Sequence, residues 1–109
     1  FLLANVVYQG HAGGLNVEHL WKVGEVATGG VHPDLTFVLD MDVTEAQQRI
    51  DRELDRMEAQ GVEHLERVRQ GFLSEAKGEH ENIVVIDAAP AVDVVQAEIQ
   101  TATKRLLNC

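Results

Sequence analysis

Two short apolar segments, residues 35–40 (LTFVLD) and 83–87 (IVVID), decide the fold of this 109-residue chain. Both are rich in strand-forming side chains, show almost no alternation of polar and apolar positions, and end in a carboxylate. Runs of this kind are typical of parallel strands that are buried on both faces. A long stretch of helical pattern separates them, so we expect a right-handed crossover between paired parallel strands. The predicted class is α/β, with a partial parallel sheet and flanking helices.

Helical periodicity occupies most of the remaining chain. We expect a mobile, glycine-bearing loop at 10–14 (GHAGG), an N-cap at Asn16, and a capping box at 44–47 (TEAQ) that opens a charged helix. The expected helices cover residues 1–9, 16–27, 44–60, 62 to near 78, and the residues after Pro90 up to 106.

The chain is acidic, with 18 Asp and Glu against 9 Lys and Arg and a formal net charge of −9. This excess of acid excludes broad binding to nucleic acid or to an anionic membrane, because both depend on Lys and Arg. Cys109 is the only cysteine, so no disulfide can form within the chain and the cytoplasm is the expected compartment. The apolar opening at residues 1–7 is too short to span a bilayer. Because it starts on Phe1 within a helical pattern, we expect the chain to be the downstream part of a longer polypeptide.

The stretch 49–58 carries three arginines, Arg49, Arg52 and Arg56, at spacing i, i+3, i+7. If the stretch is helical, the three guanidinium groups share one side and form a fork for the oxygens of a polyanion. The alternative is a solvated helix in which the interspersed Asp and Glu neutralise the arginines pair by pair. The pattern alone leaves both readings open.

Polar and aromatic side chains gather just before the glycine loop, at Asn5, Tyr8 and Gln9. The amides can both donate to and accept from the edge of a nucleobase, and a tyrosine ring supplies a flat wall. The alternative is that Asn5 is an ordinary polar helix residue and that Tyr8 is a half-buried core aromatic.

Other catalytic patterns are weak. The five histidines are scattered without metal-ligand spacing, so no metal site is predicted. Ser74 is the only serine and lacks the setting of a nucleophile. Asp40 and Asp87 close the two strands, where open α/β sheets bind ligands, although such residues also cap loops. The chain contains no Walker-type phosphate loop.

Five motifs occur in a specific order along nearly the whole chain. They are ANVVYQG at 4–10, ATGG at 27–30, PDLT at 33–36 followed by LD at 39–40, LDRME at 54–58, and VVIDA at 84–88. In this order they resemble the downstream half of bacterial thymidylate kinase. The resemblance implies that residues 1–109 are the C-terminal part of a P-loop-kinase-like domain, with its last two strands and a lid segment at about 49–60. The phosphate-loop half would lie upstream.

The resemblance also implies an activity, the transfer of the γ-phosphoryl group of ATP to dTMP, which gives dTDP for dTTP synthesis. The site residues that it implies fall into three groups. Asn5, Tyr8 and Gln9 would line the dTMP pocket, Arg52 and Arg56 would be the catalytic groups that close over the phosphates, and Arg49, Ala89 and Pro90 would contact ATP.

Further properties follow from the same resemblance. The helix over residues 16–28 would form a homodimer, and ATP would bind with Mg²⁺, whose ligands lie upstream. The 109-residue chain alone is therefore expected to be inactive. Two alternatives stay open: a non-catalytic, truncated fragment that dimerises, and a nucleoside monophosphate kinase with another base specificity.

Overall fold

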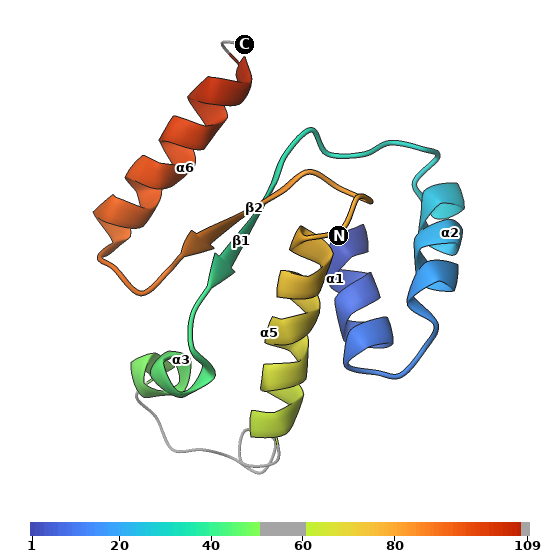
Figure 1. Cartoon of the computed structure of the whole chain (residues 1–109), viewed down its shortest axis with the longest axis horizontal. Coiled ribbons are helices and arrows are strands. Elements are labelled where there is room, and N and C mark those ends of the chain that lie inside the picture. Colours follow the sequence, from blue (N-terminus) through green and yellow to red (C-terminus); the bar gives the residue numbers. More distant parts are fainter. Residues whose placement is uncertain (51–60, 108–109) are drawn as a thin grey trace.

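The two predicted strands form a parallel pair in the computed structural model, which describes residues 1–50 and 61–107 (Figure 1). Strands β1 (Thr36–Asp40) and β2 (Ile83–Asp87) lie in register along their full length, and Asp40 is opposite Asp87. The α/β class and the parallel pairing are confirmed.

Helices lie on both sides of this strand pair. Figure 1 shows α6 (Val92–Leu107) on one side, and α1 (Leu2–Asn5), α2 (Val17–Ala27) and α5 (Val62–Ala76) on the other. No described helix is long and apolar enough to cross a bilayer.

The prediction that both strand faces are buried was only partly right. Val38 and Ile86 are buried, but Leu39 is 55% exposed and Val85 is 40% exposed. Within the described residues each strand has a single neighbour, so part of the apolar strand surface has nothing to pack against.

The first helical segment ends differently from the prediction. After α1, the chain continues as a π-helix, η1 (Val6–His11), in which Ala12 N donates to Val7 O at 2.9 Å. Gly10 is therefore inside the helix and buried, whereas the loop glycine with a positive φ is Gly14, at 86°. Val6 and Val7 of η1 are fully buried, so this part of the segment lies in the core.

The helix caps confirm one prediction and correct another. Asn16 caps α2, because its Oδ1 accepts from His19 N at 3.0 Å. The helix α3 (Val43–Ile50) starts two residues earlier than a TEAQ capping box with Thr44 as its N-cap predicts. Asp42 is the residue whose Oδ1 accepts from Thr44 N at 2.9 Å and Glu45 N at 3.3 Å, so the capping oxygen comes from Asp42 and not from Thr44.

The core lies between the strand pair and the helices α1, η1, α2 and α5. It consists of Leu2, Leu3, Val6, Val7, Trp21, Val38 and Val68. The close approach of η1 to α5 depends on Gly71, because a Cβ there would lie 2.7 Å from His11 Cβ. The core therefore fixes η1 against α5, which sets the position of the first candidate site residues.

Candidate functional site

The first candidate surface is formed by Asn5, Tyr8 and Gln9, which all lie in the continuous helical segment of α1 and η1 and are all exposed. Val6 and Val7, between them in sequence, have no exposed surface. Because the two valines are anchored in the core, the neighbouring polar side chains are left on the outside. We call this exposed set the Tyr8 wall.

The ring of Tyr8 lies against two aromatic side chains of α5. Its centroid is 6.3 Å from that of Phe72, with an edge-on geometry of 83°, and 6.4 Å from that of His64. Nearly half of the Tyr8 side chain, 48%, remains exposed. Tyr8 is thus an open aromatic surface supported from behind, a geometry that suits stacking against a planar ligand.

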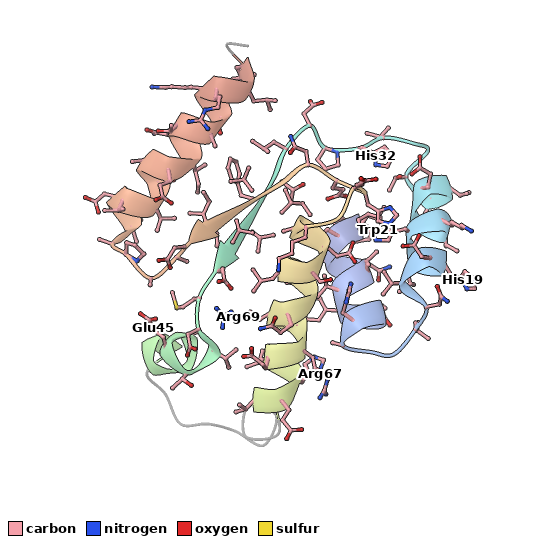
Figure 2. The ribbon with its side chains drawn as sticks, viewed as in Figure 1. His19, Trp21, His32, Glu45, Arg67 and Arg69 are labelled. Atoms are coloured by element: carbon pink, nitrogen blue, oxygen red, sulfur yellow. The ribbon has the colours of Figure 1, made fainter. Side chains whose placement is uncertain are left out.

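A buried carboxylate lies beside the last residue of η1. Glu75 of α5, which is 8% exposed, accepts from Trp21 Nε1 at 3.0 Å and contacts His11 Nε2 at 2.6 Å. Figure 2 shows Trp21 reaching from α2 toward α1. The Trp21 ring stacks on His80, with centroids 4.5 Å apart, and His80 Nε2 lies 3.2 Å from Glu18 Oε1.

The carboxylates at the two strand ends both have intramolecular partners. Arg69 donates from Nε to Asp40 Oδ1 at 2.8 Å and from Nη2 to Oδ2 at 3.1 Å. This hydrogen bonding, together with the charge of Arg69, holds the pKa of Asp40 below its ordinary value and the pKa of Arg69 above its own. Asp87 Oδ1 accepts from Ala89 N at 3.0 Å and so closes the turn after β2.

The predicted ATP residues Ala89 and Pro90 lie in this turn after β2 and are partly exposed. In Figure 1 the turn is well separated from α1, so the Tyr8 wall and the predicted adenine border are two distinct surfaces. Arg49 is in the last turn of α3. Arg52 and Arg56, the predicted catalytic groups, lie outside the described residues.

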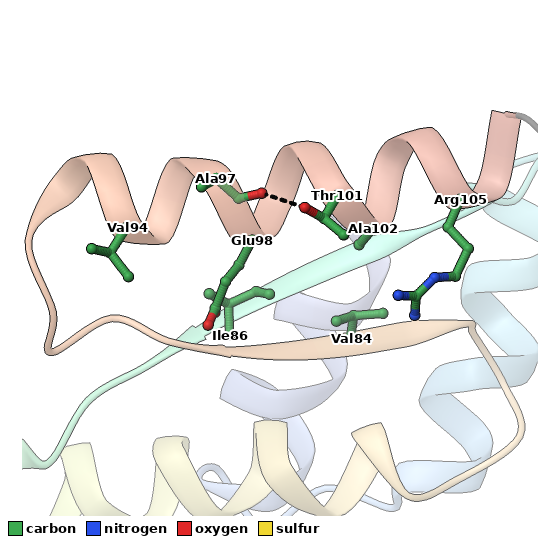
Figure 3. A pocket seen from close by; sticks show the side chains of 8 residues that line it. All are labelled: Val84, Ile86, Val94, Ala97, Glu98, Thr101, Ala102 and Arg105. Carbon is green, nitrogen blue, oxygen red and sulfur yellow. Dashed lines mark hydrogen bonds between the residues drawn. The ribbon is translucent and has the colours of Figure 1, made fainter.

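Among the hollows that adjoin the strand pair, two lie near candidate site residues or along a helix face. One, of about 280 Å³, lies between the end of β1, α3 and α5, and Asp40 and Arg69 are among its lining residues. The other is a groove of about 370 Å³ between β2 and α6, lined mainly by apolar side chains that include Val84, Ile86 and Ala102 (Figure 3).

A divalent cation has no evident place among residues 1–50 and 61–107. This part of the chain contains no group of three or more His, Cys, Asp or Glu side chains that could hold a metal ion. The strand-end carboxylates, where an oxygen-preferring cation would be expected, are already bonded to Arg69 and to Ala89 N.

Three features of this region were not predicted from the sequence. They are the two hydrogen bonds of Arg69 to Asp40 (the Arg69 clamp), the contacts of Glu75 with His11 and Trp21 (the Glu75 network), and the position of His64 beside Tyr8. Arg69 and Asp40 are far apart in sequence, and no local pattern links them. Glu75 did leave a signal, because it follows Val68 and Phe72 at helical spacing on the apolar side of α5. An acid at such a position predicts a buried partner.

Comparison with known proteins gives a consistent family. The family model described as thymidylate kinase matches residues 1–99. The thymidylate kinase of Rhodopirellula baltica is 43% identical over 99 residues, covering 91% of this chain and 40% of that protein. That of Symbiobacterium thermophilum is 40% identical over 108 residues, covering 98% of this chain and 50% of that protein. That of Kosmotoga olearia is 36% identical over 111 residues, with coverages of 100% and 52%. The chain thus spans about half the length of these relatives.

Proposed function

The chain belongs to the thymidylate kinase family, and we propose that it forms the C-terminal half of an enzyme that transfers the γ-phosphoryl group of ATP to dTMP. One observation carries this proposal: the family match extends over residues 1–99 and so includes the Tyr8 wall, the arginine stretch and the turn after β2. Such an enzyme is expected to work in the cytoplasm as part of dTTP synthesis.

In this proposal the Tyr8 wall receives dTMP. The exposed ring of Tyr8, supported by Phe72, packs against the nucleoside, while the amides of Asn5 and Gln9 hydrogen-bond to thymine. A flat ring with a fixed support loses little conformational freedom when a base packs on it, which favours binding.

The arginine stretch supplies the charge needed for catalysis. Phosphoryl transfer requires little covalent chemistry from the protein, so positioning and neutralisation of the phosphate oxygens dominate. We propose that Arg52 and Arg56 close over the phosphates and that Arg49 lies along adenine. Closure of this segment over both nucleotides also keeps water from the γ-phosphoryl group.

The donor nucleotide borders the turn after β2. Asp87 holds this turn through Ala89 N, so the backbone at Ala89 and Pro90 presents a fixed edge to adenine. Mg²⁺ accompanies ATP in this proposal and is held by residues upstream of this chain, while the strand-end carboxylates keep their partners Arg69 and Ala89 N.

The enzyme is proposed to be a homodimer through α2. This helix exposes apolar side chains, among them Val23 at 67% and Val26 at 82%, which a second copy would cover.

Competition between nucleotides tests the proposed substrate. The complete polypeptide containing this chain should phosphorylate dTMP with a higher kcat/KM than dUMP or dCMP. The reason is that the amides of Asn5 and Gln9 are proposed to hydrogen-bond to the edge of the base. Equal or greater kcat/KM for dCMP would assign the enzyme to another base and contradict the proposal.

A further inference from the structure

Glu75 is a buried acid that the proposed reaction does not use. Its two carboxylate oxygens are engaged by two different elements, since Oε2 lies 2.6 Å from His11 Nε2 of η1 and Oε1 accepts from Trp21 Nε1 of α2 at 3.0 Å. A carboxylate oxygen accepts, so His11 donates through Nε2 in this pair. One side chain of α5 therefore ties both α2 and η1 to the same point.

The hydrogen bond between His11 and Glu75 matters because of where His11 lies. His11 is the last residue of η1, the π-helical turn that also contains Tyr8 and Gln9. Its ring is only partly exposed, at 22%, and its Cβ packs closely over Gly71 of α5. The tie to Glu75 thus fixes the end of the turn that carries the Tyr8 wall.

A π turn needs such an anchor. π-helical turns are rare and occur mostly as single turns within α-helices, frequently at functional sites. If η1 relaxed to an α-helix, the residues beyond the change would rotate by on the order of 100° for each residue of shift in register. Asn5, Tyr8 and Gln9 are spaced i, i+3 and i+4 and would still share one face of an α-helix, but His11 at the end of the turn would move away from Glu75 and Gly71 of α5.

We infer that Glu75 is a positioning residue for the acceptor nucleotide: through His11 it holds the end of η1 against α5 and so fixes the turn from which Tyr8 and Gln9 face the base. The inference rests on the proposed function, because the ligand of the wall is taken to be dTMP. It differs from a purely structural role in one respect. The tie to His11 controls binding of the acceptor nucleotide, whereas the tie to Trp21 contributes to stability alone.

Three variants of the complete protein separate these two ties. His11→Ala removes the donor on the η1 side, and His11→Gln restores an N–H donor of similar reach. Trp21→Phe removes the donor on the α2 side and keeps a large aromatic ring. A fourth variant, Glu75→Gln, leaves one acceptor oxygen facing two donors and so disrupts at least one tie.

The measurements are KM for dTMP, KM for ATP, kcat, and the Kd of dTMP by equilibrium dialysis. His11→Ala is expected to raise the KM and Kd of dTMP roughly tenfold, because a small misplacement of the wall weakens base contacts, and to leave the KM of ATP within about twofold. His11→Gln should return both dTMP constants to within about threefold of the wild-type values. Trp21→Phe should lower the thermal midpoint and leave the Kd of dTMP within about twofold.

The outcomes distinguish two failures. If His11→Ala binds dTMP as the wild type does, or if Trp21→Phe weakens dTMP binding as much as His11→Ala does, the positioning role is wrong while the kinase proposal stands. If the wild-type protein neither binds nor phosphorylates dTMP, the proposed function fails and the inference fails with it. Should Glu75→Gln not fold, the two His11 variants still decide the question.

Discussion

The guanidinium group of Arg69, the residue labelled on α5 in Figure 2, binds both carboxylate oxygens of Asp40 and so joins the middle of α5 to the end of β1. The backbone continues the connection, because Asp40 O accepts from Ala88 N at 2.8 Å, just before the turn proposed to border adenine. Arg69 Nη1 also lies 3.9 Å from Asp42, the N-cap of α3. A single cation therefore fixes the end of β1, from which α3 departs and to which Ala88 of the turn after β2 is hydrogen-bonded.

The Asp40–Arg69 pair gives a pH-dependent contribution to stability. The folded-state pKa of Asp40 is lowered, so the pair stabilises the fold fully above the ordinary Asp pKa of about 3.9, and this stabilisation is lost as the pH falls through the lower folded-state pKa. Asp40→Asn is expected to reduce the free energy of unfolding by about 1 to 3 kcal/mol near neutral pH, and less below about pH 4. Urea unfolding of the wild type and Asp40→Asn, near neutral pH and below about pH 4, measures the free-energy cost of the substitution at each pH.

The matched control for this prediction is Asp34→Asn, which changes an exposed acid in the loop before β1. It should change the free energy of unfolding little at either pH. A cost of Asp40→Asn that stays constant across the acidic range would show that the lowered pKa of Asp40 makes no contribution to stability.

Gly71 is expected to be required for the contact between α5 and η1. Gly71→Ala places a Cβ 2.7 Å from His11 Cβ and 3.0 Å from Val7 Cγ1, and overpacking of this kind costs about 1 to 3 kcal/mol. At Gly78, the nearest atom to an added Cβ is 3.4 Å away, so Gly78→Ala should be close to neutral. Thermal unfolding of the two variants provides the comparison, and equal midpoints would argue against a tight contact at Gly71.

The exposed ring of Tyr8 is expected to contribute to acceptor binding through its flat face. Tyr8→Ala should raise the KM of dTMP about tenfold, whereas Tyr8→Phe keeps the ring and should change this KM by less than about threefold. Steady-state kinetics with varied dTMP and saturating ATP gives both values. If Tyr8→Phe raised the KM of dTMP as much as Tyr8→Ala does, the hydroxyl group and not the ring face would make the contact with dTMP.

The proposed dimer surface on α2 can be tested with a charge. Val26→Asp should dissociate the dimer of the complete protein, because it places an unpaired carboxylate in an apolar interface. Val92→Asp is the control, since Val92 is 84% exposed at the start of α6, compared with 82% for Val26 on α2. Sedimentation velocity at micromolar concentration should find the first variant monomeric and the second dimeric. A wild-type protein that is itself monomeric would contradict the proposed interface.

Local sequence patterns predicted the elements of this fold well. The strands β1 and β2 are apolar runs bounded by turn residues, and a parallel crossover is the arrangement such runs adopt with helical sequence between them. The cap at Asn16 followed from a short polar side chain placed before an amphipathic run. These features depend on neighbours in sequence, which is why they could be read without the structure.

The features that were mispredicted or missed depend on tertiary packing. No periodicity signals that η1 is a π-helix with Val6 and Val7 fully buried in it. The Arg69 clamp on Asp40 likewise requires two segments to meet in space. For the site, the residues of the Tyr8 wall were proposed from sequence and the structure describes them as exposed, but the Glu75 anchor beside the last residue of η1 emerged only from the packed helices.

The most direct test of the account is the rate of phosphoryl transfer from ATP to dTMP by the complete protein, compared between the wild type and Arg56→Ala, with Arg67→Ala on α5 as the exposed control. We expect the wild type to phosphorylate dTMP, Arg56→Ala to lower kcat by about 100-fold or more with a much smaller change in the KM of dTMP, and Arg67→Ala to retain most of the activity. A wild type without this activity, or an Arg56→Ala variant with an unchanged kcat, would contradict the account.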